Sequence, residues 1–399
     1  MLNNDSHQAG SDHIGKRHMA IIWRHSALAH RHAAIGGELE DWNGMGTAWF
    51  YDHTPERAKA DYEAIRTKAG LMDVSGLKKC HVVGADAAYV IDRVTTRNVE
   101  KIAPGRSTYA SILNADGKFI DDCIIYHLAV NTWMVVHGTG TGMEQLTAVA
   151  AGKNCSVLFD DDLHDMSLQG PVSVDLLAEE IPTIRDLAYF GIMQTRLYGR
   201  DVMISRTGYT GERGYEIFCR AKDATHLWDS ILEAGKDKGV RPVQFSTLDL
   251  LRTESYLLFY PGDNSETYPF DGETCGDTLW ELGLEFTVSP GKIGFIGAEN
   301  HYAAKGNERF KIYGVVLDGT TPADEGATLL QDGHEVGHVT FGMYSDVNKH
   351  NVAIARMPVG AATPGTALTV RNADGTEIAA KASEMPFYDL DKSIRTAKG

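Results

Sequence analysis

One stretch, Ser205 to Ile217, constrains the fold of this chain more than any other. It reads Ser-Arg-Thr-Gly-Tyr-Thr-Gly-Glu-Arg-Gly-Tyr-Glu-Ile, with apolar runs at 202–204 before it and 215–218 at its end. Its three glycines allow the tight, positive-φ backbone that joins two strands. The stretch therefore predicts two strands joined by a compact loop. The loop presents the ring of Tyr209, and Glu216 is held near the start of the second strand.

A rigidly held carboxylate at Glu216 suits a planar heterocycle, because it can accept two parallel N–H bonds, as it does from a guanidinium group. A pterin ring offers such a paired donor edge. The same pattern also fits a surface turn with a solvated glutamate, since glycine-rich turns are common. It does not fit a phosphate-binding loop, because no Gly-Lys-Ser/Thr follows.

This loop resembles the motif of the glycine-cleavage aminomethyltransferase (T-protein) family, whose members bind tetrahydrofolate and include folate-dependent demethylases. Further segments match in the same order, so the resemblance covers residues 36 to 390. It implies an α+β fold of three lobes, in which two interleaved α+β lobes and a C-terminal β-barrel surround a central folate channel. The expected boundaries are a flexible arm at 1–20, the folate-binding region at 21–305 and the barrel at 310–399.

A second landmark is a predicted hairpin, residues 109–127, with its turn at Asn114 to Gly117. Side chains alternate along a strand, so Asp121 and Asp122 should point to opposite faces, one toward a cleft and the other toward solvent. The residues alone also fit a solvated strand end. The resemblance implies that Asp122 is the catalytic carboxylate and that Tyr109 contacts the folate.

The resemblance extends the folate site to Tyr209, Tyr189 and Arg252. Tyr189 fits a core position equally well, and Arg252 also fits a buried ion partner. The family's folate-engaging arginine is replaced here by Leu248, so we expect either the grip on folate or the substrate class to differ.

Five residues are assigned to the substrate side: Trp42, Tyr51, Asp73, Ser75 and His137. The two aromatic residues come from a segment similar to the family's opening motif, and aromatic faces suit a methylated cation. Core packing explains the same aromatics. Asp73 and Ser75 belong to a segment similar to another family motif, and they also fit a cap between a helix and a strand.

Two helices have clear end signals in the sequence. The first is predicted at 54–69, with Thr54 as its N-cap, Pro55 in its first turn and Ala69-Gly70 as its end. The second is predicted at 224–239 and ends at a glycine.

A glycine-rich run, His137 to Met143, follows a strand-like segment and opens a predicted helix. It is similar to a dinucleotide-binding fingerprint, but the third glycine is absent and the run does not open a βαβ unit. We therefore set nucleotide binding aside. In the family this position lies beside the folate and usually carries asparagine, so His137 is expected to alter substrate contacts.

The charge and composition of the chain limit the kinds of partner that it can bind. The formal net charge of −16 argues against nucleic acid, and the apolar runs are too short to cross a membrane. A polar start and five scattered cysteines predict a cytoplasmic chain with reduced, mostly buried thiols. His25, His30 and His32 do not share one helix face, so no metal site is predicted.

The implied function is one-carbon transfer to tetrahydrofolate. The leading hypothesis is demethylation of a small methylated substrate (an amine, betaine, sulfonium or methoxy compound) by methyl transfer to N5. Leu248, His137 and a longer link at 272–281 favour it, because they depart from the family pattern. The resemblance implies that this link lies on the substrate side. One alternative is the aminomethyltransferase of glycine cleavage, which acts on a lipoyl carrier protein. The other is a non-catalytic folate-binding protein, against which the retained Asp122 argues.

Overall fold

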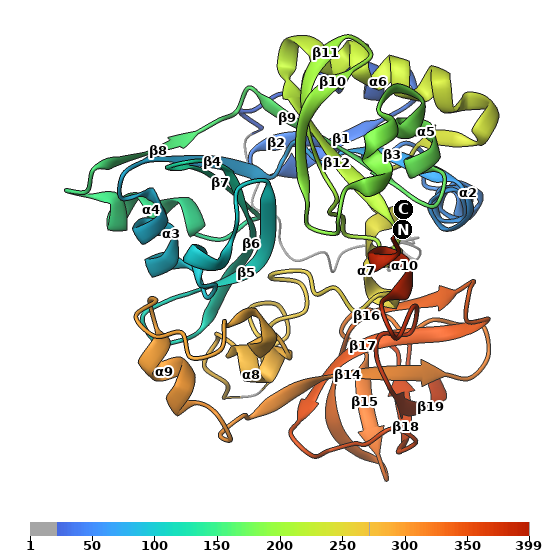
Figure 1. Ribbon diagram of the computed structural model, residues 1–399. Coiled ribbons are helices and arrows are strands. Elements are labelled where there is room, and N and C mark those ends of the chain that lie inside the picture. The colour runs from blue at the N-terminus through green and yellow to red at the C-terminus, as the bar shows by residue number, and fades with distance from the viewer. Residues whose placement is uncertain (1–21, 271, 399) are drawn as a thin grey trace, which may run out of the picture.

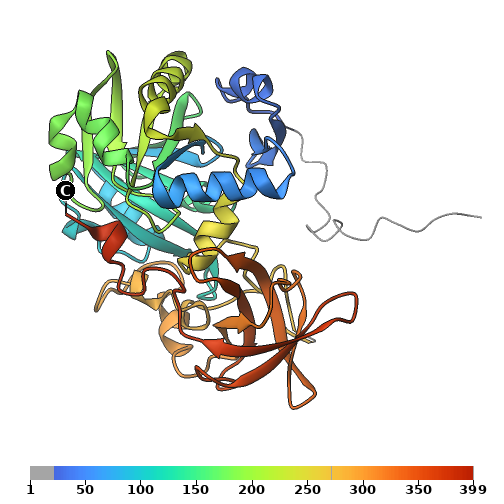
Figure 2. The same cartoon turned by 90° about the vertical axis from the view of Figure 1, so that its right-hand side faces the viewer.

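The computed structural model describes residues 22–270 and 272–398 and arranges them in three lobes (Figures 1 and 2). Two lobes are sheets covered by helices, and the third is a closed barrel. The predicted arm at 1–20 lies outside the described residues. Within the described ranges, no helix combines the length and apolar character needed to cross a bilayer.

The first lobe is a six-stranded sheet in the order β10-β11-β12-β9-β3-β13, in which only the β3–β13 pair is parallel. Its strands are β3 (Ala69–Asp73), β9 (Leu163–Gln169), β10 (Ile192–Leu197), β11 (Arg200–Ser205), β12 (Gly214–Arg220) and β13 (Val240–Pro242). The helices of this lobe are α2 (Pro55–Thr67), α5 (Ser173–Glu180) and α6 (Ala221–Gly235). One face of the sheet buries an aliphatic core that includes Leu71, Leu168 and Ile217.

The second lobe is inserted in the chain between β3 and β9, so the two lobes are interleaved. It is a five-stranded antiparallel sheet in the order β5-β6-β7-β4-β8. Its elements are β4 (Lys78–Gly84), β5 (Arg106–Leu113), β6 (Phe119–Ala129), β7 (Thr132–His137) and β8 (Cys155–Phe159), with α3 (Ala87–Val94) and α4 (Gly142–Ala150). These two helices cover one face of the sheet, and the other face meets the first lobe.

The third lobe is a closed barrel in the order β14-β17-β16-β15-β18-β19. Its strands are β14 (Phe310–Leu317), β15 (Thr328–Gln331), β16 (His334–Ser345), β17 (His350–Pro358), β18 (Ala367–Arg371) and β19 (Glu377–Ser383). After β19 the chain leaves the barrel, and the Tyr388 N–H bonds the carbonyl of Glu254, the last residue of α7 (Thr247–Glu254), at 2.8 Å. It then forms a short helix, α10 (Ser393–Thr396).

The remaining elements connect the lobes. They are α1 (Ala29–Ala34), the hairpin β1 (Glu38–Trp42) and β2 (Met45–Phe50), α8 (Leu279–Leu282), α9 (Ala298–Ala303), and 3-10 turns at Val99–Lys101, Pro182–Asp186, Lys236–Lys238 and Glu285–Thr287.

Local signals located the helices but not all of their ends. Thr54 caps α2 as predicted, because its hydroxyl accepts a hydrogen bond from the Arg57 N–H at 3.3 Å. The predicted closure of that helix by Ala69 and Gly70 is wrong, since both residues open the buried strand β3. The helix predicted at 224–239 instead starts at Ala221 and ends at Gly235.

All five cysteines are free thiols. Cys80, Cys123 and Cys219 are buried, Cys155 is partly buried and Cys275 is exposed.

Candidate active site

Alternation along β6 divides its side chains between two environments. Ile124 and Tyr126 pack with Met134 and Phe218 where the two sheets face each other. Cys123 and Ile125 point the other way, into the core under α3 and α4. Asp122 shares the first face by parity, so it points toward the interface between the lobes.

The two neighbouring aspartates point to opposite faces, as the alternation predicted. The expectation that one of them faces solvent is wrong, however. Asp121 is 1% exposed, and its carboxylate lies 2.9 Å from Nδ1 of His137. The start of β6 thus carries a buried carboxyl group, Asp121, beside a partly buried one, Asp122, and each has its own partner.

Asp122 is held by Tyr109 on the neighbouring strand β5, whose hydroxyl donates a hydrogen bond to Oδ2 at 2.7 Å. Burial raises the pKa of Asp122 to about 7, the negative charge of Asp121 adds to this, and the bond from Tyr109 opposes it. Both protonation states are therefore populated near neutral pH. A carboxyl group of this kind can give up a proton and take one back.

Glu216 lies on β12, on the sheet face opposite the aliphatic core. Among the described residues, both hydrogen bonds that it accepts end on Oε2, one from the Thr207 hydroxyl and one from the Tyr126 hydroxyl at 3.3 Å. Burial raises the pKa of Glu216, and these two bonds oppose the rise. The other oxygen, Oε1, is available to the donor edge of a planar ligand.

The loop between β11 and β12 is shaped around the amide of Gln169. A Cβ at Gly208 or at Gly214 would lie 2.1 Å from Oε1 of Gln169, so glycine is required at both positions. The amide nitrogen of Gln169 donates to the Thr207 carbonyl at 3.2 Å, and its oxygen accepts from the Thr210 hydroxyl at 3.2 Å. The loop that supports Glu216 is thus fixed from beneath by one buried side chain.

Tyr209 links this loop to the segment after α7. Its hydroxyl donates to the carbonyls of Leu257 at 3.2 Å and Leu258 at 2.5 Å. Burial raises its pKa well above the usual value, and the charge of Asp122 contributes to the rise. Tyr209 therefore lies within electrostatic reach of the predicted catalytic carboxyl group.

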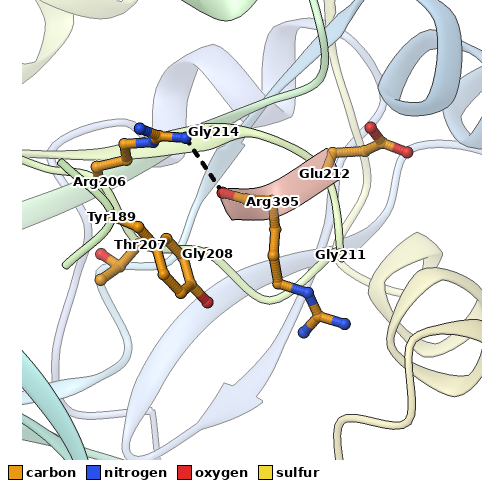
Figure 3. Close-up of a pocket in the computed structure, with 8 residues that line it drawn as sticks. All are labelled: Tyr189, Arg206, Thr207, Gly208, Gly211, Glu212, Gly214 and Arg395. Carbon is orange, nitrogen blue, oxygen red and sulfur yellow. Dashed lines mark hydrogen bonds between the residues drawn. The ribbon is translucent and has the colours of Figure 1, made fainter. Parts of the chain in front are cut away.

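Tyr189 lines a small pocket beside the glycine loop (Figure 3). Arg395 of α10 reaches the same pocket and is 8% exposed. Within the part of the chain that the structure describes, Nε and Nη2 of Arg395 have no hydrogen-bond partner. A buried guanidinium with free donors suits a polar ligand. Sequence reasoning missed Arg395, because a single arginine in a polar tail carries no pattern.

Arg252 has partners inside the protein. It pairs with Asp249 at 3.0 Å and with Asp263 at 2.5 Å, and Asp263 also accepts a hydrogen bond from Thr340 of the barrel at 2.6 Å. Its contact with folate stays a prediction. Leu248 is buried in an apolar cluster with Phe245, so the position where the family has arginine is here part of a core.

Four of the five predicted substrate residues lie in two settings. Trp42 packs on Phe245 with ring centroids 4.6 Å apart. Tyr51 and Asp73 both bond His32: the Tyr51 hydroxyl lies 2.8 Å from Nδ1, and Nε2 lies 3.1 Å from Asp73. Ser75 donates its backbone N–H to Asp73 at 3.0 Å. Their substrate role stays a prediction, since these polar atoms are engaged within the chain.

His137 is 1% exposed and bonds Asp121, on the face of β6 opposite to Asp122, and its substrate contact stays a prediction. No cluster of three His, Cys, Asp or Glu side chains able to hold a metal ion occurs among the residues described. His32 instead joins the network with Tyr51 and Asp73.

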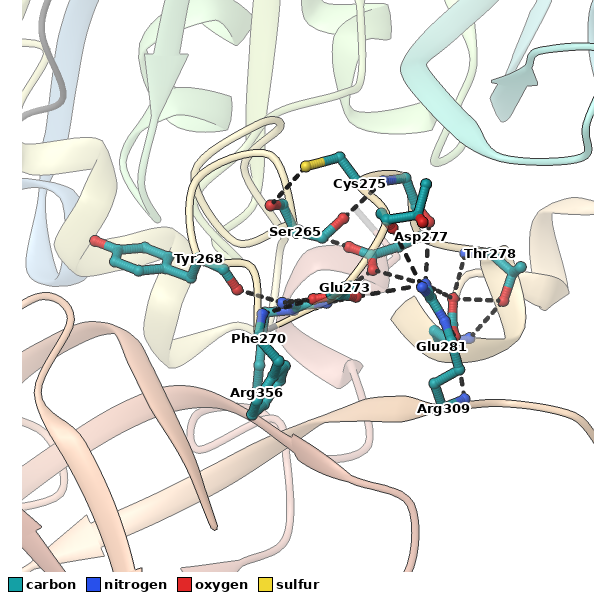
Figure 4. A network of polar contacts seen from close by, with 12 residues as sticks. Ser265, Tyr268, Phe270, Glu273, Cys275, Asp277, Thr278, Glu281, Arg309 and Arg356 are labelled. Atoms are coloured by element: carbon teal, nitrogen blue, oxygen red, sulfur yellow. Dashed lines mark hydrogen bonds and ion pairs between the residues drawn. The ribbon is translucent and has the colours of Figure 1, made fainter. Parts of the chain in front are cut away.

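The segment at 272–281 is tied to the barrel by an ion network (Figure 4). Arg356 pairs with Glu273 at 3.1 Å and with Asp277 at 2.8 Å, and Arg309 pairs with Glu281 at 2.7 Å. The carbonyl of Asp277 accepts a bond from the N–H of Phe119, the first residue of β6, at 2.8 Å. The segment thus connects the barrel to the strand of Asp122. Its predicted place on the substrate side stays a prediction.

Comparison with known families decides the identity of the fold. Residues 28–292 match the GCVT N-terminal domain, and residues 311–389 match the glycine cleavage T-protein C-terminal barrel domain. The chain belongs to the glycine cleavage T-protein family. The predicted family, the three-lobed α+β fold and the assignment to a family of one-carbon-transferring enzymes are thereby confirmed.

Relatives of this T-protein family member differ in their named activities. The heme-dependent oxidative N-demethylase gamma subunit of Ectopseudomonas mendocina is 58% identical over 386 residues, which are 96% of this chain and 100% of the relative. The trimethylamine-oxide aldolase of Ruegeria pomeroyi is 32% identical over 84% of this chain, which spans 43% of that relative. The crystal structure of the glycine cleavage aminomethyltransferase T of Bartonella henselae matches with a TM-score of 0.81 and 25% identity, covering 92% of this chain and 98% of that one.

Proposed function

We propose that this T-protein family member transfers a one-carbon unit from a small methylated amine to tetrahydrofolate, acting as one subunit of an N-demethylating enzyme. The observation that carries the proposal is Asp122, a carboxyl group with a pKa of about 7 that faces the interface of the lobes. The end-to-end match to an N-demethylase gamma subunit supports the substrate class and the subunit role. The haem in that name is a property of the relative, and the proposal does not require it here.

The residues at the site fit a reduced folate. Oε1 of Glu216 can accept the paired donors of a pterin, and the free donors of Arg395 can hold polar groups of the same ligand. Bound tetrahydrofolate would supply a nucleophilic nitrogen that takes up the one-carbon unit. The carboxyl groups of Asp122 and Glu216 are partly buried, which favours proton transfer between the ligand and the protein.

Asp122 would manage the proton in this reaction. In its ionised form it accepts the proton that the attacking nitrogen loses, and in its neutral form it returns a proton to the leaving amine. Tyr109 holds one oxygen of Asp122 and so aims the other at the ligand. Positioning supplies the rest, because two reactants held in contact react as one molecule.

The test measures one-carbon uptake by tetrahydrofolate with the purified full chain and no carrier protein. Methylated ammonium compounds and formaldehyde serve as separate donors, each compared with the uncatalysed rate. Uptake that is faster than the uncatalysed rate and is lost in Asp122→Asn supports the proposal. A methylated folate product indicates methyl transfer, and a methylene-bridged product indicates a donor at the formaldehyde level. No acceleration with either donor contradicts the proposal.

The aminomethyltransferase reading remains the second candidate, because the fold matches such an enzyme with a TM-score of 0.81. It predicts no uptake from small donors and transfer only from an aminomethylated lipoyl carrier protein. The same assay, repeated with that carrier as donor, separates the two functions.

A further inference from the structure

A second titratable pair lies directly behind Asp122, on the opposite face of β6. Asp121 is 1% exposed, and its Oδ2 lies 2.9 Å from Nδ1 of His137, which is also 1% exposed. The other oxygen of Asp121 accepts the backbone N–H of Asp122 at 2.9 Å. The imidazole, the carboxylate and the backbone of the predicted catalytic residue therefore form one continuous chain of contacts.

The glycine-rich turn after β7 encloses this pair, and this close packing explains the glycines of the motif at 137–143. A Cβ at Gly140 would lie 2.0 Å from the Ile120 carbonyl and 2.7 Å from Cβ of Asp121. A Cβ at Gly142 would lie 3.1 Å from Nδ1 of His137. The turn needs glycine because it wraps closely around Asp121 and His137, and it keeps water away from them.

Other titratable groups reach the pair from several elements. Cys80 on β4 has its Sγ 4.0 Å from Nε2 of His137, and Lys78 on the same strand donates to the Gly140 carbonyl at 3.2 Å. The negative charge of Asp121 contributes to the raised pKa of Cys123 on β6 and of Tyr260. The charge of Glu144 on α4 contributes to the raised pKa of Cys80. Lys78 is the cation among these groups, and it bonds backbone carbonyls rather than Asp121.

Histidine can do at this position what asparagine cannot. Both side chains can donate a hydrogen bond to Asp121, but only imidazole gains a positive charge in the physiological pH range. A charged imidazole offsets the negative charge that Asp121 exerts on Asp122. In this buried setting the interaction between neighbouring charges is strong, so a charge on the imidazole acts on the carboxyl group of Asp122 through Asp121.

We propose that His137 is a positioning residue for the one-carbon transfer: it holds Asp121 and supplies or withholds a positive charge there, which sets the pH range in which Asp122 exchanges its proton. The inference rests on the proposed role of Asp122. It assigns His137 to the control of the catalytic carboxyl group and not to the substrate.

The test compares four variants through the pH dependence of kcat/KM. H137N leaves Asp121 uncompensated, so the midpoint assigned to Asp122 should rise by about one pH unit. D121N removes the negative charge, so the midpoint should fall by a similar amount. H137N/D121N should match D121N, because His137 acts only through Asp121. H127N is the control, since His127 lies on the same side of β6 as Asp121 but bonds the Ile102 carbonyl at 2.6 Å instead of a carboxylate.

A direct titration makes the result independent of turnover. Infrared difference spectra of the carboxyl stretch, recorded across the pH range, follow the protonation of Asp122 even in a chain that transfers nothing, and the D122N spectrum identifies its band. A midpoint in H137N equal to those of the wild type and H127N overturns the inference, as does a shift caused by H137N that persists in the D121N background. Lack of turnover together with the expected infrared shifts contradicts the proposed function but leaves this inference standing.

Discussion

Asp73 is buried and Asp122 is partly buried, and the pKa values of the two carboxyl groups are shifted in opposite directions. Asp73 is 8% exposed and accepts bonds from Ser26 at 2.5 Å, from His32 at 3.1 Å and from the Ser75 N–H at 3.0 Å. Burial alone would raise its pKa, but these bonds outweigh it and hold the pKa well below the usual range.

The effects that shift the pKa of Asp122 combine differently. Its side chain accepts one bond, from Tyr109, and burial with the adjacent charge of Asp121 raises its pKa to about 7. The difference teaches that the donors around a buried carboxyl group decide its role. Several donors produce a fixed charge that holds the structure together, and a single donor leaves a group that exchanges protons at neutral pH.

The largest expected effect is on turnover. Asp122→Asn keeps the shape of the side chain but cannot accept a proton, so kcat should fall by roughly 10²–10⁴. Steady-state kinetics of one-carbon uptake measures this. Asp116→Asn, an exposed residue in the turn of the same hairpin, is the matched control and should leave kcat unchanged. A loss below about threefold in Asp122→Asn would mean that Asp122 is no general acid or base.

The next effect, on stability, tests the structural role of Asp73. Asp73→Asn removes one partner of a buried charged network and leaves His32 and Tyr51 without it, so the free energy of unfolding should fall by about 3 kcal/mol. Denaturant unfolding measures the loss. Asp229→Asn breaks an exposed pair with Arg31 and should cost under about 1 kcal/mol. If Asp73→Asn is as stable as the wild type but fails to bind substrate, Asp73 belongs to the site after all.

Glu216 provides a smaller and more specific effect. Glu216→Gln keeps the bonds from Thr207 and Tyr126 possible but removes the charge that a pterin edge would meet. We expect the Kd for tetrahydrofolate, measured by calorimetric titration, to rise at least tenfold, which is about 1.4 kcal/mol. Glu233→Gln, exposed on α6, is the control. An unchanged Kd would remove Glu216 from the folate site.

The smallest effect is a change of stability with pH. The pKa of Asp122 is raised in the folded chain, so its contribution is fully present below its unfolded pKa of about 4 and is lost as pH rises through about 7. Asp122→Asn has no such loss. The variant should therefore gain stability relative to the wild type between pH 6 and pH 7, on the order of 1 kcal/mol. Unfolding free energies at the two pH values would contradict this if their difference were equal in both proteins.

The sequence allowed much of the fold to be predicted because its signals are local. Glycines between alternating apolar runs identified the strands around Gly208 and Gly214, and a Thr-Pro pair identified the start of α2. Helix ends were less predictable. Ala69 and Gly70 looked like a helix terminus, but pairing with β9 and β13 made them part of a buried strand.

The site was predictable only where family motifs name a residue. Asp122, Tyr109, Tyr209 and Glu216 could be chosen in this way, although their function awaits the tests above. The partners of a residue depend on contacts between distant segments. Nothing near His137 in sequence indicates that it bonds Asp121, 16 positions away, and nothing near Arg395 indicates a place beside a loop 189 positions earlier.

The path of the chain after the barrel has a consequence for biosynthesis. The guanidinium of Arg206, at the start of the glycine loop, donates to the carbonyls of Arg395 and Ala397. The pocket beside that loop therefore includes residues that leave the ribosome after both lobes and the barrel have been made. A nascent chain can fold its two sheets first, but it completes this pocket only when α10 has been made. The formation of this pocket thus reports that translation of all three lobes is finished.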